Sequence, residues 1–191
     1  MRYATKWPVY AADWDRMTIK ADRLHEFVEQ AEFAIKHKAI YQEASEAGFP
    51  WAMVAVVHRR ERDCDFDTYL GNGQSLKHKT TKVPKGRGPF LGPKAFIDGC
   101  IDAVRQEGWA SVHEWPLERV LYHLELFNGT GYDGKGFPSP YLFGGTNIQK
   151  PGKYTSDHVF SKKVMDKQPG CAPLLQQIMK LDPSVTLMRE S

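Results

Sequence analysis

Cysteine and long apolar runs are both scarce in this sequence. The 191-residue chain has three cysteines, which lie far apart at Cys64, Cys100 and Cys171. Such spacing provides neither a disulfide framework nor the paired ligands of a zinc site, so we expect free thiols and folding in a reducing cytosol. The longest apolar run, residues 51–57, is too short to span a bilayer, and the first residues lack the apolar core of a secretory signal. We therefore expect no stable membrane insertion and no signal-directed export.

Signals for metal ions are also missing. The seven histidines show no metal-ligand spacing. Asp63, Asp65 and Asp67 alternate as in a calcium-binding loop. The positions that such a loop gives to glycine and glutamate are held here by Thr68 and Gln74. We therefore expect no metal and no cofactor.

The charge balance is close to neutral, with 26 basic and 23 acidic side chains and a net charge of +3. This small excess allows weak attraction to an anionic polymer such as the bacterial cell wall. It does not favour nucleic acid, because no basic stripe with interleaved aromatic residues occurs. One basic cluster lies within residues 77–87, and we interpret it as a solvated loop. Its members are Lys77, His78, Lys79, Lys82, Lys85 and Arg87.

What the sequence does contain is the composition of a globular protein, with 41% hydrophobic and 26% charged residues. Its length suits one domain covering residues 1–191. Helical spacing of apolar residues predicts four amphipathic helices, at residues 17–47, 94–107, 116–127 and 172–181. Residues 1–15 lack this periodicity and are expected to be irregular. Residues 64–93 are expected to form strand and loop, with a hairpin turn at Asn72 and Gly73. The predicted fold class is α+β, mostly helical.

Residues 51–57 are apolar on every side, and a helix of that kind belongs in the interior of a protein. A buried strand is the alternative, because the run is rich in β-branched residues. We favour a helix because Pro50 suits the start of one and a charged string, residues 58–63, continues it.

Glu61 falls near the C-terminal end of this predicted helix. The negative end of the helix dipole and burial against apolar neighbours both disfavour its charged form. The flanking residues Arg59, Arg60 and Arg62 oppose this effect. Successive residues diverge by about 100° around a helix, so the three arginines cannot all face the carboxyl. A carboxylic acid that stays protonated near neutral pH can act as the general acid in glycosidic-bond cleavage. The alternative is a helix-end glutamate paired with an arginine.

Other side chains could assist such an acid. Asp65 and Asp67 follow closely, and either could orient a water molecule, although solvated turn carboxylates are the alternative. Glu125 borders the apolar stripe of a predicted helix, where it is either a buried structural acid or a catalytic partner. Tyr132 and Tyr141 lie on segments rich in glycine and proline, where aromatic rings either stack on sugars or pack a loop down.

The order of these features resembles that in goose-type lysozymes and soluble lytic transglycosylases. It consists of an apolar helix ending in Glu61, a short β segment, and a late helix leading into residues 126–132. The chain more closely resembles a group of tailed-phage endolysins and related bacterial "lysozyme family" proteins, over about residues 15–175. The residues that carry this resemblance are Pro50, Trp51, His58, Arg59, Arg60, Glu61, Asp65, Phe66, Leu70, Asn72, Gly73, Val83, Pro84, Gly86, Arg87, Asn128, Gly129, Gly131, Tyr132, Ser139, Pro140, Tyr141, Leu142, Gly152, Lys153 and Tyr154.

The resemblance implies a lysozyme-like fold with a small β-hairpin lobe beside the cleft. It also implies cleavage of the β-1,4 bond between N-acetylmuramic acid and N-acetylglucosamine in peptidoglycan during host lysis. Glu61 would hold the acid position, and Asn128 and Tyr132 would lie on the cleft wall. Peptidoglycan glycan strands are then the expected partner. We expect a monomer without a separate wall-binding module, held in the host cytoplasm until it is released to the periplasm.

The chain departs from the group where a second functional residue would be sought. Arg62 stands where the group has serine or asparagine, and Gln74 stands where it often has an acid. Thr80 and Thr81 are available for the threonine of viral lysozymes of the Glu–Asp–Thr type, but no aspartate has that type's spacing from Glu61. Gln74 and Thr81 are substrate-binding candidates.

The second catalytic residue stays open among Asp67, Asp65 and Glu125. Two alternatives to a hydrolase also remain. One is a lytic transglycosylase that forms anhydro-muramic ends. The other is a non-catalytic glycan-binding or virion structural protein on the same scaffold.

Overall fold

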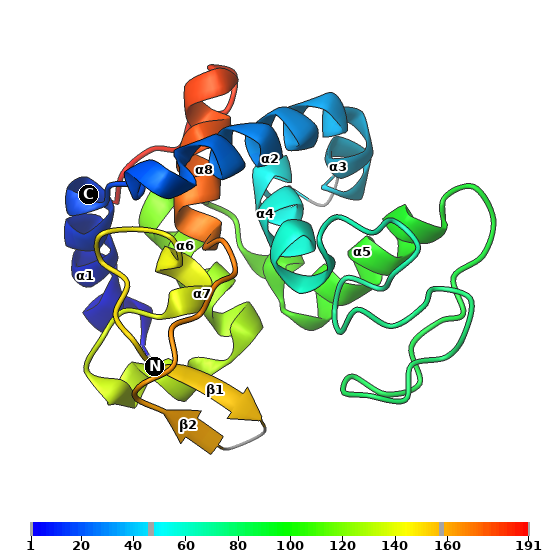
Figure 1. Ribbon diagram of the computed structural model, residues 1–191. Helices are drawn as coiled ribbons and strands as arrows, with labels where there is room; N and C mark the ends of the chain where they lie inside the picture. The colour runs from blue at the N-terminus through cyan, green and yellow to red at the C-terminus, as the bar shows by residue number, and fades with distance from the viewer. Residues whose placement is uncertain (1, 46–47, 157–158, 191) are drawn as a thin grey trace. The chain divides into compact units, whose positions relative to one another are not determined.

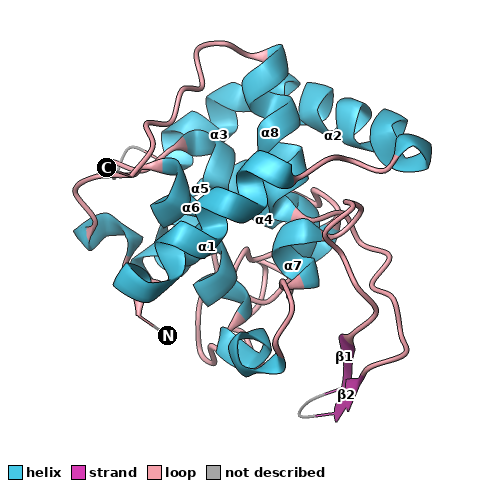
Figure 2. Ribbon diagram, turned by 90° about the vertical axis from the view of Figure 1, so that its left-hand side faces the viewer, coloured by secondary structure: helices cyan, strands magenta, loops and turns pink. Residues whose placement is uncertain are grey.

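The computed structural model describes residues 2–45, 48–156 and 159–190. Within these ranges the chain is mostly helical and contains a two-stranded antiparallel sheet, which confirms the predicted α+β class (Figures 1 and 2). The α-helices are α1 (Tyr3–Arg16), α2 (Leu24–Lys36), α3 (Lys38–Ala44), α4 (Trp51–Arg62), α5 (Ala95–Gln106), α6 (Leu117–Asn128), α7 (Pro140–Phe143) and α8 (Cys171–Leu181). Three short 3-10 helices are η1 (Ala21–Arg23), η2 (Trp109–Ser111) and η3 (Thr130–Lys135), and the strands are β1 (Lys153–Ser156) and β2 (Val159–Ser161).

The chain divides into two compact units. Unit 1 combines Met1–Glu32 with Pro116–Ser191, and unit 2 is Phe33–Trp115. Unit 2 is therefore inserted between the two segments of unit 1, and the boundary falls within α2. No helix among the described residues is both long and apolar enough to cross a membrane.

Unit 2 is organised around α4. Every residue of this helix from Trp51 to His58 is buried, and α3 and α5 pack together in the same unit. The prediction of a buried helix at residues 51–57 is confirmed, and the alternative of a buried strand is wrong. Pro50 is the N-cap residue with extended geometry, as its fixed φ angle and missing N–H favour. The helix predicted at residues 94–107 forms as α5 and ends before Gly108, whose φ of 71° suits glycine.

Unit 1 contains α1, α6, α7 and α8, and the β1–β2 sheet lies between α7 and α8 in the chain. The predicted helices at residues 116–127 and 172–181 form as α6 and α8. The apolar side chains of Val120, Leu121 and Leu124 are fully buried. Arg189 joins α1 to α6, because it forms ion pairs with Asp15 of α1 and with Glu118 of α6.

The prediction that residues 1–15 are irregular is wrong, because Tyr3–Arg16 form α1; residue 1 lies outside the described part. Pro8 lies inside this helix, where a proline removes one backbone hydrogen bond. Packing against α6 stabilises the helix nevertheless. The ring of Tyr3 meets the edge of Tyr122 at a centroid distance of 5.3 Å, and the Tyr10 hydroxyl donates a hydrogen bond to Glu125.

The single helix predicted over residues 17–47 is divided into η1, α2 and α3; residues 46 and 47 lie outside the described part. The chain leaves regular helix at His37, whose ring nitrogen Nδ1 lies 2.8 Å from the carbonyl oxygen of Phe33. The apolar stripe predicted for this helix, which includes Leu24, Phe27 and Ala31, is only partly buried. Phe27 and Ala31 are fully buried, whereas Leu24 is 45% exposed.

The prediction of a β-hairpin just after the buried helix is wrong in position. The turn at Asn72 and Gly73 forms, but only one isolated bridge, between Thr68 and Ser75, flanks it. A half-buried strand alternates inward and outward side chains. Here Thr68, Tyr69 and Leu70 are buried in succession, which does not fit that alternation. The two-stranded sheet lies instead in unit 1, where Tyr154 pairs with Phe160 across β1 and β2.

Candidate functional site

Glu61 lies in the last turn of α4 and is half-buried. The chain changes direction directly after it, because Asp63 and Cys64 both adopt positive φ angles, of 51° and 64°. Two backbone hydrogen bonds close this end of the helix: Asp63 N–H to the Arg59 carbonyl at 3.1 Å, and Cys64 N–H to the His58 carbonyl at 3.3 Å. Glu61 thus lies in the last turn of a mostly buried helix whose end is sharply defined.

The arginines beside Glu61 have identifiable neighbours. Arg59 forms an ion pair with Asp63 at 2.5 Å. The aliphatic part of Arg62 lies against the backbone of Gly73, where even one added methyl group would meet it at 2.5 Å. Arg60 is buried. The three guanidinium groups therefore occupy different surroundings, as their positions around a helix require.

The end of α4 is fixed from inside by His58. Its ring is fully buried between Phe66 and Phe96, at centroid distances of 4.8 and 4.5 Å. The Tyr41 hydroxyl lies 3.0 Å from Nδ1. Burial lowers the pKa of His58 to about 4, so the ring is neutral at neutral pH. A neutral aromatic cluster therefore supports the turn of helix that carries Glu61.

The two candidate aspartates after Glu61 lie on the exposed side of the following segment. Asp65 accepts a hydrogen bond from the backbone N–H of Asp67 at 3.0 Å, which caps the local turn. Asp67 lines a pocket of about 370 Å³ in unit 2, whose walls include the rings of Phe66, Phe90 and Phe96. Of the two, Asp67 is the one that faces a space able to hold a ligand.

The structure brings Gln74 and Thr81 together. The side-chain carbonyl of Gln74 accepts hydrogen bonds from the backbone N–H groups of Thr81 and Lys82, at 2.9 and 2.7 Å. Its amide donates to the Thr81 hydroxyl at 3.0 Å. Asn72 adds hydrogen bonds to the carbonyls of Lys82 and Val83. The two amide side chains thus fix the shape of the segment between α4 and α5.

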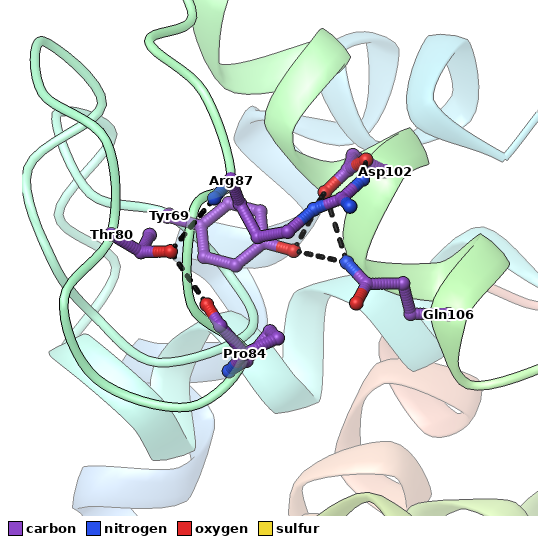
Figure 3. Close-up of polar contacts among 6 residues, drawn as sticks. All are labelled: Tyr69, Thr80, Pro84, Arg87, Asp102 and Gln106. Atoms are coloured by element: carbon purple, nitrogen blue, oxygen red, sulfur yellow. Dashed lines mark hydrogen bonds and ion pairs between the residues drawn. The ribbon is translucent and has the colours of Figure 1, made fainter.

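A polar network that the sequence analysis did not identify anchors this segment to α5 (Figure 3). Arg87 forms an ion pair with Asp102, which also accepts hydrogen bonds from the Tyr69 hydroxyl at 2.8 Å and from Gln106 at 3.1 Å. Burial raises the pKa of Asp102, but the hydrogen bonds from Arg87 and Tyr69 outweigh it and hold that pKa below the ordinary 3.8. The only signal in the sequence was the helical position of Asp102 beside an apolar stripe.

Glu125 and Tyr132 lie in unit 1, where both line a second pocket, of about 240 Å³. Glu125 is 5% exposed and accepts the hydrogen bond from Tyr10. Burial raises its pKa, the hydrogen bond from Tyr10 and the charge of Lys6 lower it, and the net shift is upward from the ordinary 4.5. Glu125 is thus a buried acid with a raised pKa, and its position fits both the structural and the catalytic function weighed for it.

The remaining candidates also belong to unit 1. Asn128 is the exposed last residue of α6. Tyr132 is 7% exposed, and its hydroxyl accepts a hydrogen bond from the Tyr154 N–H at 3.3 Å. Tyr141 is only 2% exposed in α7, so its ring packs inside the unit and offers little surface to a sugar.

The candidates thus fall into two sets, one in each unit. Unit 2 holds Glu61, Asp65, Asp67, Gln74 and Thr81, and unit 1 holds Glu125, Asn128, Tyr132 and Tyr141. Direct contact joins Gln74 to Thr81, and a shared pocket joins Glu125 to Tyr132. Across residues 2–45, 48–156 and 159–190, no group of three or more histidine, cysteine, aspartate or glutamate side chains is arranged to hold a metal ion.

Comparison of the chain with protein-family models, with curated proteins and with solved structures gives no match.

Proposed function

We propose that this protein cleaves the glycan strands of peptidoglycan, at the β-1,4 bond between N-acetylmuramic acid and N-acetylglucosamine, with Glu61 as the general acid. The observation that carries the proposal is the position of Glu61. It is a half-buried residue in the last turn of a helix whose first eight residues, Trp51 to His58, are all buried. This arrangement supports the acid position that the resemblance to lysozyme-family endolysins implies.

The chemistry follows from that position. Glu61 donates its proton to the glycosidic oxygen, so that the leaving sugar departs as a neutral alcohol. Water then attacks the anomeric carbon. Asp67 is the candidate base for this water within unit 2, because it lines the apolar pocket, whereas Asp63 is paired with Arg59. The proposal includes a lysozyme-like arrangement, a monomer, and storage in the host cytoplasm until release to the cell wall.

A lytic transglycosylase is the second candidate. In that reaction the C6 hydroxyl of the muramic acid attacks instead of water, and one acid can serve both steps. The engagement of two nearby carboxylates favours it: Asp63 is bound to Arg59, and Asp65 caps the turn at Asp67. Glycan-strand cleavage by Glu61 is common to both candidates, and the products separate them.

The test is the Glu61→Gln variant in a peptidoglycan digestion assay. Glutamine keeps the size of the side chain but cannot donate a proton, so the rate should fall by at least about a hundredfold, as for loss of a general acid. Glu32→Gln, at an exposed position of α2, is the matched control and should digest peptidoglycan at the parent rate. Circular dichroism should show the same helix content in all three proteins.

Mass spectrometry of the released muropeptides identifies the reaction. Reducing ends indicate a hydrolase, and anhydro-muramic ends indicate a transglycosylase. An active Glu61→Gln protein would remove Glu61 from the mechanism. A parent protein that binds peptidoglycan but releases no muropeptide would favour the non-catalytic alternative.

A further inference from the structure

The segment that joins α4 to α5 contains a long stretch without acidic residues. Between Asp67 and Asp98 there is no aspartate or glutamate, while the basic side chains of the sequence cluster gather at residues 77–87. We call residues 77–87 the lysine loop. Its four lysines, at positions 77, 79, 82 and 85, are exposed, and within the described residues none of them forms an ion pair. Their charge is therefore not neutralised by the unit that carries them.

The lysine loop is held in one conformation by hydrogen bonds. The N–H of Thr80 donates to the Arg87 carbonyl at 2.9 Å, and the N–H of Gly86 donates to the Thr80 carbonyl at 2.8 Å, so the segment closes on itself. The buried Thr80 hydroxyl also donates to the Pro84 carbonyl and accepts from the Arg87 N–H (Figure 3). Gln74 and Asn72 hold Thr81, Lys82 and Val83 from the other side, as described above. A loop ordered in advance loses little conformational entropy on binding.

The end of this closed loop exposes an aliphatic side chain. Val83 is 80% exposed, although its backbone carbonyl is held by Asn72. Lys82 precedes it directly and Lys85 follows two positions later, and both are exposed. An aliphatic group displayed between ammonium groups matches the interface of an anionic bilayer. There, lysines meet the phosphate groups and a short apolar side chain reaches the boundary of the acyl chains.

We propose that the lysine loop is a docking surface for anionic phospholipid membranes, with Val83 at the point of contact. This peripheral contact is independent of the proposed glycan cleavage and does not require insertion of a helix. Nucleic acid fits less well, because binding to single strands uses stacked aromatic rings and the loop contains no phenylalanine, tyrosine or tryptophan. The lysines act mainly by charge, so binding should weaken as salt is added.

The experiment measures co-sedimentation of the full-length protein with vesicles at low salt. Vesicles of equal parts phosphatidylglycerol and phosphatidylcholine should bind it, and pure phosphatidylcholine vesicles should bind it far less. The double variant Lys82→Glu/Lys85→Glu should bind the anionic vesicles at least about tenfold more weakly, since each lysine near such a surface contributes about fivefold. The matched control is Lys162→Glu/Lys163→Glu, the same charge change at two exposed lysines of unit 1.

A second pair of variants tests the apolar contact. Val83→Ser should weaken binding to the anionic vesicles, whereas Val159→Ser, at a 54% exposed valine of β2, should not. Circular dichroism and melting temperature identify any variant that fails to fold. The catalytically disabled Glu61→Gln protein should bind vesicles like the parent, so this test and the test of glycan cleavage fail independently.

Three results would overturn the proposal. The first is no binding to anionic vesicles at low salt. The second is binding that the Lys82→Glu/Lys85→Glu change leaves intact. The third is a Val83→Ser protein that binds vesicles as tightly as the parent while both bind duplex DNA equally well, which would indicate a general polyanion site.

Discussion

At the scale of single residues, burial and hydrogen bonds together determine whether the pKa of an acidic side chain is raised or lowered. Glu125 is enclosed by unit 1 and accepts a hydrogen bond from Tyr10, and its pKa lies above the ordinary value. Asp102 is partly exposed and bound to Arg87, and its pKa lies below the ordinary value. The pKa of a carboxyl group is thus shifted in opposite directions at the two positions. Residue type alone therefore could not assign a function to either residue.

The Glu125→Gln substitution should change how stability depends on pH. A raised pKa in the folded state means that Glu125 favours folding below pH 4.5 and that this contribution is lost as the pH rises through the folded-state value. Glutamine stays neutral and can still accept the Tyr10 hydrogen bond. The difference between the melting temperature of the variant and that of the parent should therefore be more positive at pH 7 than at pH 4.

The check is thermal unfolding at a series of pH values, with the exposed Glu32→Gln variant measured alongside. Parallel pH profiles for the parent and Glu125→Gln would show that the carboxyl does not titrate with folding. A peptidoglycan assay on the same proteins tests the catalytic alternative for Glu125, because a purely structural acid leaves the digestion rate per folded molecule unchanged.

At the scale of elements, the sequence predicted those features whose causes are local. Residues 51–57 are apolar on every side, and they form the buried part of α4. Gly108 ends α5 as expected, because the chain needs a positive φ angle there. The position of Glu61 in the last turn of α4 followed from the same local pattern.

The features that the sequence did not predict depend on distant partners. Helix α1 contains Pro8 and shows no clear apolar stripe, and it packs on α6, which lies more than 100 residues later. The ion pair between Arg87 and Asp102 joins a loop to a helix, and no pattern in the sequence indicates that these two residues pair. Tyr69 and Leu70 are both buried, which only the packing of unit 2 explains.

The segment between α4 and α5 yields a prediction about Gln74. Gln74→Ala removes the acceptor for the N–H groups of Thr81 and Lys82. Loss of a hydrogen bond of typical net strength should accelerate hydrogen exchange at these two amides by about tenfold. Gln74→Glu is the matched control, since its carboxylate can still accept both hydrogen bonds. Unchanged protection in Gln74→Ala, measured by NMR, would show that Gln74 does not order the loop.

At the scale of the whole molecule, acid should unfold the protein through two histidines. Burial lowers the pKa to about 4 both for His58, which is buried in unit 2, and for His123, which is half-buried in unit 1. A lowered folded-state pKa means that the neutral ring contributes stability above pH 6.5 and that this is lost as the pH falls towards 4. For His58 alone the loss amounts to about 3 kcal/mol, at about 1.4 kcal/mol per pKa unit.

The test compares the parent with His58→Gln between pH 7 and pH 4.5. The variant is expected to be less stable at pH 7, because the His58 ring packs against Phe66 and Phe96. The informative quantity is the change in unfolding free energy with pH, which should be smaller in His58→Gln. The exposed His113→Gln variant should keep the steep dependence of the parent. Equal slopes in all three proteins would contradict the prediction.

The insertion of unit 2 within unit 1 affects how the protein is made on the ribosome. About 100 residues separate Arg16, at the end of α1, from Leu117, at the start of α6. At about 5–20 residues per second, α1 emerges about 5–20 s before its packing partner. Phe33–Trp115 can be complete during that interval, whereas α1 waits with its aromatic side chains uncovered until α6, whose Tyr122 packs on Tyr3, has been translated. Nascent chains should therefore depend on chaperones mainly through α1, Tyr3–Arg16.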